Sequence, residues 1–512
     1  MRKGIALTAI VAMLAQGPAM AVPAERITPQ GGKGLCYRPG PLPRLGAEQQ
    51  DQQQRPTPRP MPVRSKRSDY PIAEAPSAPP PPPADAAAVS GSARDVVVAS
   101  DAPAAAGGEF SSREARAETA KVAPGETAGY PDAMPPPPRR PPPPRPQSGL
   151  LTAGEHDDLL NPELYASYLR RANLGQQMPD LPRLDTSRVL TVAVKDRSGR
   201  PVPFAPVELA CADGGRLRLA TTADGTVSFF PELDRLGQRV WLRAGQDEWR
   251  EVAIAAGGGG QQVQFTQRSD AVGPKKLDLM LVIDTTGSMS DEIRYLQAEL
   301  ASILSSLRQR HPGLDIRVGF VFYRDLGDDY VTQTVPLTRD FTRAQAELGQ
   351  RWAGGGGDYP EAMDQAMVRA AGQDWRPDAV KSLLLVADAP PHDENVGLTW
   401  RASEVLRHQR VQIVPVAASG VADKAEYVMR AMAAMTQSRY TFLTDDSGIG
   451  NRHARPAIDC YLVTRLDALL RRVIDSQISG RRIEPESQEV IREVGQYDHG
   501  KCLIPPGGLR DQ

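Results

Sequence analysis

The pattern of hydrophobic and polar positions changes twice along the chain. Between residues 184 and 268, apolar and polar residues alternate in short segments, as at Leu190, Val192 and Val194, and turn residues separate these segments about every 8–12 residues. From residue 275 to residue 480, continuous apolar segments alternate with segments in which apolar residues recur at helical spacing. The pattern predicts a multidomain protein in which a small all-β sandwich precedes an α/β domain.

One turn in the β module carries a specific signal. Asp224-Gly225 lies between Thr221-Thr222 and an apolar segment at residues 227–229. Asp-Gly between two strand-like segments is typical of a tight hairpin turn. We therefore predict that the strands on either side of this turn pair with each other.

The α/β domain, residues 275–480, shows the alternation of strands and helices that places a mostly parallel sheet between two layers of helices. The predicted strands cover residues 277–283, 316–323, 330–337, 382–387, 412–417 and 440–443. The predicted helices cover residues 291–310, 341–352, 361–371, 400–409, 424–436 and 462–478. A short helical segment at residues 151–180, with its helix at 156–174, precedes the β module, and residues 481–512 form a C-terminal tail.

Composition separates the beginning of the chain from these domains. Many of the 48 prolines lie in residues 22–150, with uninterrupted runs at residues 79–83, 135–138 and 141–144. Such runs adopt extended polyproline II and bury too little apolar surface to offset chain entropy. We predict a disordered, proline-rich spacer. Because arginines flank some of these prolines, the alternative is a ligand for a proline-binding domain.

The first 21 residues are typical of a secretory signal peptide. Arg2 and Lys3 precede a short apolar stretch at residues 5–14, and Ala19-Met20-Ala21 fits the small-residue rule for cleavage after Ala21. The stretch is too short to cross about 30 Å of hydrocarbon, which disfavours an uncleaved membrane anchor. We expect an exported protein, whether periplasmic, surface-bound or secreted, with no transmembrane segment after cleavage.

Export makes the four cysteines candidates for disulfides, and four cysteines allow three pairings. Cys460 precedes the last predicted helix, and Cys502 lies in the tail beyond that helix. We predict a Cys460–Cys502 bridge, because it would fold the tail back over the domain. The state of Cys36 and Cys211 stays open.

Candidate chemistry lies at the ends of two predicted strands. The strand at residues 277–283 runs into Asp284-Thr285-Thr286-Gly287-Ser288, and Asp388 follows the strand at residues 382–387. Ligands of open α/β sheets bind at the carboxyl ends of strands, and these side chains offer the oxygen atoms that Mg²⁺ prefers. Helix capping is the competing explanation. An unpaired carboxylate at the end of a buried strand is, however, costly unless it meets a cation.

This motif resembles the metal-ion-dependent adhesion site of von Willebrand factor A (vWA) domains, and the resemblance covers about residues 275–480. It implies a Rossmann-like fold and a site for Mg²⁺, or else Mn²⁺ or Ca²⁺. The residues that it assigns to the metal are Asp284, Thr286, Ser288 and, through water, Asp388. Residues 194–225 resemble a carboxypeptidase-regulatory or transthyretin-like sandwich, a structural module without catalytic residues.

The second loop of the predicted metal site departs from the family pattern. Four glycines at residues 354–357, followed by Asp358-Tyr359-Pro360-Glu361, resemble the loop of hemicentin-like and many bacterial vWA proteins. The family normally supplies a threonine here, and Asp358 stands nearest to that position. Asp358 is therefore either a further metal ligand or the cap of a helix that begins at Pro360.

These observations favour a non-enzymatic binding protein whose metal takes an oxygen atom from a protein or glycan partner. The predicted rim of the site comprises Arg324, Asp325, His392 and Asp393. A net charge of −1, without a basic run interleaved with aromatics, makes nucleic acid an unexpected partner. One alternative is an envelope scaffold or assembly factor with a structural metal. The other is a metal-dependent hydrolase that uses Ser288, His392 and Asp393.

Overall fold

A nine-stranded sheet forms the centre of the computed structural model, which describes residues 34–48, 145–171 and 181–503. The strand order is β11-β10-β9-β12-β13-β14-β1-β15-β16. In this order the strands are β11 (Thr332–Thr338), β10 (Asp315–Tyr323), β9 (Lys276–Asp284), β12 (Val380–Ala387), β13 (Gln412–Ala417), β14 (Tyr440–Thr444), β1 (Thr152–His156), β15 (Tyr461–Arg465) and β16 (Arg492–Val494).

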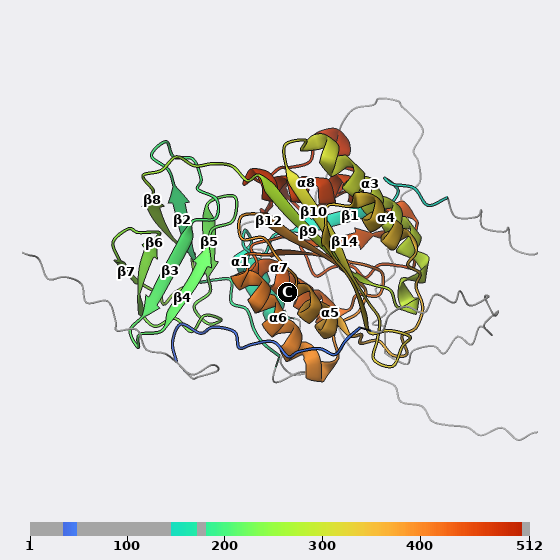
Figure 1. Ribbon diagram of the computed structural model, residues 1–512, viewed down its shortest axis with the longest axis horizontal. Helices are drawn as coiled ribbons and strands as arrows, with labels where there is room; N and C mark the ends of the chain where they lie inside the picture. Colours follow the sequence, from blue (N-terminus) through green and yellow to red (C-terminus); the bar gives the residue numbers. More distant parts are fainter. Residues whose placement is uncertain (1–33, 49–144, 172–180, 504–512) are drawn as a thin grey trace, which may run out of the picture. The chain divides into compact units, whose positions relative to one another are not determined.

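The middle of this sheet is parallel and covered on both faces. Strands β10, β9, β12, β13 and β14 run in one direction, and β9 and β12 are buried along nearly their whole length. Apolar side chains of alternating direction therefore enter two separate cores. One face packs against α5 (Met363–Ala371), α6 (Val396–His408) and α7 (Asp423–Met435), and the other against α3 (Ile293–Arg310), α4 (Phe341–Gly349) and α8 (Leu466–Ser479) (Figure 1).

The sheet is mixed rather than mostly parallel. Four of its pairings are parallel, and the four that involve β11, β1 and β16 are antiparallel. Strand β1 comes from the segment predicted as helical; in the described part of that segment, residues 151–171, α1 (Pro162–Arg171) is the only helix. The predicted helix at 462–478 was also too long, because its first residues form β15. Both corrections have one cause: β1 lies between β14 and β15 and bonds to each of them.

Two smaller sheets share a third core. The first contains β5 (Thr226–Phe229), β2 (Leu190–Lys195) and β8 (Gln261–Thr266); the second contains β4 (Arg216–Ala220), β3 (Pro206–Cys211), β6 (Arg239–Ala244) and β7 (Arg250–Ala253). The hairpin predicted around Asp224-Gly225 is wrong. The turn forms, with the N–H of Thr222 donating to the carbonyl of Thr226, but β4 pairs with β3 and β5 with β2. The chain crosses between sheets at this turn.

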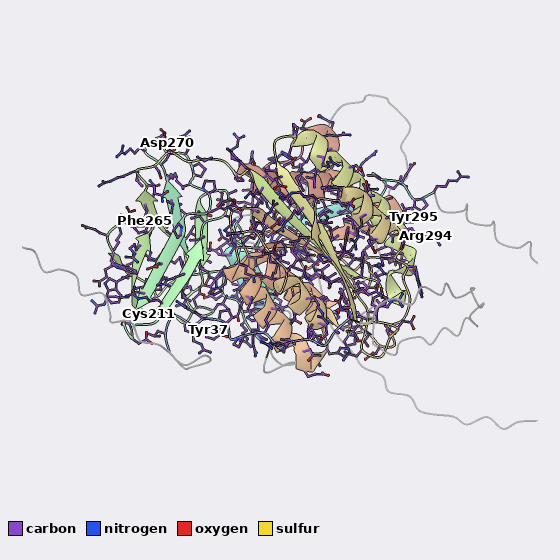
Figure 2. All side chains as sticks on the ribbon, viewed as in Figure 1. Tyr37, Cys211, Phe265, Asp270, Arg294 and Tyr295 are labelled. Carbon is purple, nitrogen blue, oxygen red and sulfur yellow. A yellow bond between two sulfur atoms is a disulfide. The ribbon has the colours of Figure 1, made fainter. Side chains whose placement is uncertain are left out.

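Part of the predicted spacer belongs to the folded unit. Cys36 is bonded to Cys211 at the end of β3, and Figure 2 shows Tyr37 near the same end of the small module, away from Asp270. Twelve residues further on, the carboxylate of Glu48 accepts a hydrogen bond of 2.9 Å from the backbone N–H of Thr334 on β11. Residues 34–48 are therefore held by the rest of the fold. The predicted signal peptide and residues 22–33 and 49–144 of the predicted spacer lie outside the described residues.

The C-terminal tail is also attached. Cys460 and Cys502 form a disulfide, β16 pairs with β15, and β17 (Tyr497–Asp498) pairs with β18 (Lys501–Cys502). In the part of the chain that the structure describes, no helix has the length and apolar character needed to cross a membrane.

Candidate metal centre

The first loop of the candidate site begins where β9 ends. Asp284 and Thr286 are fully buried, and Asp284 Oδ1 accepts hydrogen bonds from the backbone N–H of Thr286 at 2.8 Å and from its hydroxyl at 2.7 Å. The hydroxyls of Thr286 and Ser288 lie 3.1 Å apart. The motif thus brings one carboxylate and two hydroxyls together, as predicted for a metal-binding loop.

Backbone hydrogen bonds join this loop to the second one. Gly287 N–H donates to the carbonyl of Gly355, and Gly354 N–H donates to the carbonyl of Thr285, each at 3.0 Å. A Cβ atom on Gly287 would lie 2.9 Å from the Gly355 oxygen, closer than real Cβ contacts allow. The Asp328 carboxylate in turn accepts a hydrogen bond of 2.8 Å from Gly356 N–H. The glycines therefore serve close backbone approach, and the loop is fixed at several points.

The third loop supplies Asp388, directly after β12. It is 2% exposed, and Gly420 packs beside it. The hydroxyl of Tyr359 donates to the carbonyl of Gly420 at 2.9 Å and accepts from Ala422 N–H at 2.8 Å. Tyr359 thereby ties the second loop to the segment that lies next to Asp388.

Buried carboxylate oxygens without partners are the main electrostatic feature of the site. Asp284 Oδ2, Asp388 Oδ1 and Glu361 Oε2 are buried, and none has a hydrogen-bond partner among the described residues. Burial raises the pKa of Asp284 to about 6, in spite of the hydrogen bonds from Thr286. Burial and the charge of Asp284 raise the pKa of Asp388 to about 8. Unpaired buried carboxylates are unfavourable, and a cation would stabilise their ionised forms.

Glu361 was not assigned to the site from the sequence. It is 2% exposed, and burial together with the charges of Asp284 and Asp325 raises its pKa to about 10. The only signal in the sequence was its place in the glycine-rich loop motif, because its burial beside Asp284 depends on the fold. Arg452 was also missed, since it comes from a loop far along the chain.

Asp358 is exposed and does not cap a helix. Helix α5 begins at Met363, five residues later, and its N-cap residue is Ala362. Asp358 instead lines an open cleft of about 530 Å³ that also contains Ser288 and Asp388. The remaining residues that line this cleft are Gly287, Gly355, Gly356, Gly357, Tyr359, Glu361, Ala389, Ser419, Gly420, Asn451 and Arg452.

The donor set fits a hard divalent cation. Within residues 34–48, 145–171 and 181–503, no three histidine, cysteine, aspartate or glutamate side chains group so that they could hold a metal alone. A cation at this cleft would therefore need the hydroxyls of Thr286 and Ser288 beside Asp284 and Asp388. All of these donors are oxygen atoms, and two of the carboxylates have a free buried oxygen, which suits Mg²⁺ with waters retained.

The predicted rim residues have different environments. Arg324 is buried: its guanidinium stacks over Tyr330 and Trp352 at 4.6 and 4.3 Å and donates to the Trp352 carbonyl. Arg324 is therefore packed inside the fold and does not lie on an exposed rim. His392 pairs with Asp325, with 2.7 Å between Nε2 and Oδ1, and this partner raises the pKa of His392 against the effect of burial.

Asp393 is exposed and forms an ion pair with Lys424. His392 is thus paired with Asp325 and Asp393 with Lys424. The Ser288–His392–Asp393 arrangement that a hydrolase would use is not formed. The carboxylate on His392 is Asp325, and Ser288 is directed to Thr286 and Asp388. The arrangement of these side chains favours ligation over nucleophilic catalysis.

The chain resembles known proteins in part of its length. The Alpha-protein kinase vwkA of Dictyostelium discoideum is 32% identical over 120 residues, which are 23% of this chain and 19% of the kinase. Among solved structures, BatB of Bacteroides thetaiotaomicron is 11% identical, with a TM-score of 0.27 over 39% of this chain and 98% of BatB. The open form of the pilus adhesin SpaC of Lactobacillus rhamnosus GG is 14% identical, with a TM-score of 0.28 over 36% of this chain and 28% of SpaC.

The family model of the von Willebrand factor A domain matches residues 278–451, which contain all three loops of the cleft. This range begins within β9, continues through β14 and ends before β15, so β1, β15 and β16, which complete the sheet, and α8, which packs on it, lie outside the range. The family predicted from the sequence is confirmed over this range. Residues 278–451 of this chain therefore match the von Willebrand factor A domain family.

Proposed function

We propose that this protein is an exported, non-enzymatic binding protein that captures a protein or glycan partner through a divalent cation in its vWA domain. One observation carries the proposal. Buried oxygens of Asp284 and Asp388 have no hydrogen-bond partner among the described residues and lie beside the hydroxyls of Thr286 and Ser288. Asp284, Thr286, Ser288 and Asp388 would hold the cation, with Mg²⁺ the expected ion.

The cleft supports binding rather than a purely structural metal. Ser288 and Asp388 line an open space of about 530 Å³, so an oxygen atom of a partner could reach a cation held there. When bound, the cation supplies a Lewis-acidic position for such an oxygen. The backbone bonds between the first two loops hold the donors in place before a partner arrives.

Calorimetric titration of the full chain with Mg²⁺ and Mn²⁺ tests the metal site. The full chain is needed because β1, which lies before the small module in sequence, completes the vWA sheet. We expect one bound ion, and we expect Asp284→Ala to abolish binding. Asp374→Ala is the matched control, because that side chain is 97% exposed and pairs with Arg317 at the other end of β10. Unchanged affinity in Asp284→Ala would contradict the proposal.

A second measurement separates partner binding from an envelope scaffold with a structural metal. Wild type and Asp284→Ala are used as baits for envelope material with Mg²⁺ or with chelator. Specific retention that requires both Mg²⁺ and Asp284 supports capture through the metal. Retention that survives chelation, with only a lower melting temperature, supports the scaffold. Export is tested by the N-terminal sequence of the mature protein, which we expect to begin at Val22.

A further inference from the structure

A second cleft lies where the carboxyl end of α8 meets the turn between β4 and β5. Its volume is about 200 Å³, and none of the candidate metal ligands lines it. Gln477, Ser438, Arg481 and Asp224 contribute polar groups, and Val473 and Ala223 contribute apolar surface. The small module and the vWA domain both supply walls. Clefts between domains are common positions for small-molecule sites.

Two buried side chains in this cleft have unused hydrogen-bonding groups. Gln477 is 7% exposed, and neither its Oε1 nor its Nε2 has a hydrogen-bond partner within the described residues. Ser438 is 6% exposed, and its Oγ is likewise without a partner there. An amide has two donor hydrogens and an acceptor oxygen, and a hydroxyl has one donor and an acceptor. Leaving such groups buried and unpaired is unfavourable, and a ligand that bonds to them would remove that cost.

Gln437, the residue before Ser438, has hydrogen-bond partners for its side-chain amide, unlike Gln477. Gln437 donates from Nε2 to the Thr226 hydroxyl at 3.0 Å, and its Oε1 accepts from Ser228 N–H at 3.0 Å. Both the nitrogen and the oxygen of the Gln437 amide are thus hydrogen-bonded to β5 of the small module. Gln477 and Ser438 line the same cleft, but their buried polar groups have no hydrogen-bond partner within the described residues.

Charge in the cleft is balanced. Arg439 pairs with Glu155 at 2.8 Å, and Arg482 pairs with Asp157 at 3.1 Å. Arg481 and Asp224 contribute one further charge of each sign, and the charges sum to zero once Glu155 is counted, which pairs with Arg439 but does not itself line the cleft. A charged ligand would gain little here. A ligand whose groups each donate and accept, as hydroxyls do, matches an amide, a hydroxyl, a guanidinium and a carboxylate together.

We propose that this cleft binds a small, neutral polyhydroxyl molecule of about the size of one sugar ring. Gln477 and Ser438 would bond to its hydroxyls at depth, and Arg481 and Asp224 would bond to it nearer the mouth. The site is independent of the metal, so the binding requires no divalent cation.

Ligand-observed NMR and isothermal titration of the full chain in chelator test this site. The probes are glucose, galactose, N-acetylglucosamine and sorbitol, with glucuronate as the charged comparison. We expect saturable binding of at least one neutral probe and weaker binding of glucuronate. Methyl glycosides of the sugar that binds show whether a free sugar or the end of a glycan is accepted.

Variants locate the binding. We expect Gln477→Leu to weaken it at least tenfold and Ser438→Ala to weaken it severalfold, with thermal unfolding as the check that both fold. Gln373→Leu is the control, because Gln373 is a half-buried glutamine beyond the end of α5 and does not line the cleft. The proposal would be overturned if no neutral probe bound saturably. It would also be overturned if Gln477→Leu and Ser438→Ala both bound the probe as tightly as wild type does. A cleft filled with ordered water only would give that result.

Discussion

The backbone N–H of Gly287 donates a 3.0 Å hydrogen bond to the carbonyl oxygen of Gly355, and this bond fixes the first loop of the candidate metal centre against the second. A Cβ atom on Gly287 would lie 2.9 Å from that oxygen, so the two loops would have to separate. The position of the Thr286 and Ser288 hydroxyls relative to Asp388 depends on these loops. We therefore expect separation of the two loops to weaken cation binding more than it lowers the stability of the fold.

We predict that Gly287→Ala lowers Mg²⁺ affinity by about tenfold, equivalent to about 1.4 kcal/mol. Titration calorimetry of the full chain measures the change. Gly397→Ala is the control, because a Cβ at Gly397 on α6 would contact nothing within 4 Å. Wild-type affinity in Gly287→Ala would show that the loops tolerate the added methyl group without moving the donors.

Asp358 adds a negative charge to the cleft without capping a helix. We predict that Asp358→Thr weakens Mg²⁺ binding, by about two- to fivefold because an exposed carboxylate is screened by solvent. The same change is expected to improve capture of carboxylate-bearing ligands, since one repelling charge is removed. Parallel titrations of wild type and Asp358→Thr measure the first effect. Equal affinities would show that Asp358 does not act on the ion.

Glu404 gives a pH dependence that is separate from the metal. It is 6% exposed on α6, and burial raises its pKa to about 7, with Arg407 lowering it and Asp234 raising it. Because the pKa of Glu404 in the folded state exceeds the ordinary glutamate value of 4.5, the folded state holds the proton more tightly than the unfolded state. Stability is therefore lost as pH rises from about 4.5 to about 7.

We predict that Glu404→Gln removes this loss. The free energy of unfolding of the variant is expected to exceed that of wild type by about 2–3 kcal/mol at pH 8 and by less than about 1 kcal/mol at pH 5. Urea unfolding at both pH values measures the difference. A gain that is equal at pH 5 and pH 8 would point to a packing effect rather than to ionisation of Glu404.

The Cys460–Cys502 disulfide closes a loop with a sequence separation of 42 residues. In the chain-entropy model such a bridge contributes about 3–4 kcal/mol, so we predict a loss of this order in Cys460→Ser/Cys502→Ser. Denaturant unfolding measures this loss. The variant Cys36→Ser/Cys211→Ser, measured in the same way, gives the contribution of the second bridge, and reduced wild type gives the effect of losing both bridges. Recovery of both residues as free thiols on peptide mapping of the oxidised protein would contradict the pairing.

The parts of this protein that could be predicted from sequence are those whose signal is local. From Leu279 to Ile283, strand β9 is a continuous apolar segment because both of its faces are buried, and the motif from Asp284 to Ser288 places three oxygen donors within five residues. The helices of the vWA domain carry their apolar residues at helical spacing because each faces one core. These features determined the family and the first loop of the site.

Other parts depend on which segments become neighbours. The residues of β1 show no apolar alternation, and they are buried because β14 and β15 bond to them on both sides. Gly154 on β1 is needed there, since a Cβ would lie 2.5 Å from the ring of Phe442. The Asp224-Gly225 turn formed as predicted, yet only the tertiary structure decided that its two strands enter different sheets.

The candidate site shows the same division. Asp284, Thr286 and Ser288 lie together because they are adjacent along the chain, so sequence alone determined their proximity. Glu361 and Arg452 reach the same cleft only through folding, and the partner of His392 is Asp325 rather than the adjacent Asp393 for the same reason. Local periodicity reports the burial of one segment. Contacts across the sheet depend on strand order, and burial beside other carboxylates is what raises the pKa of Glu361.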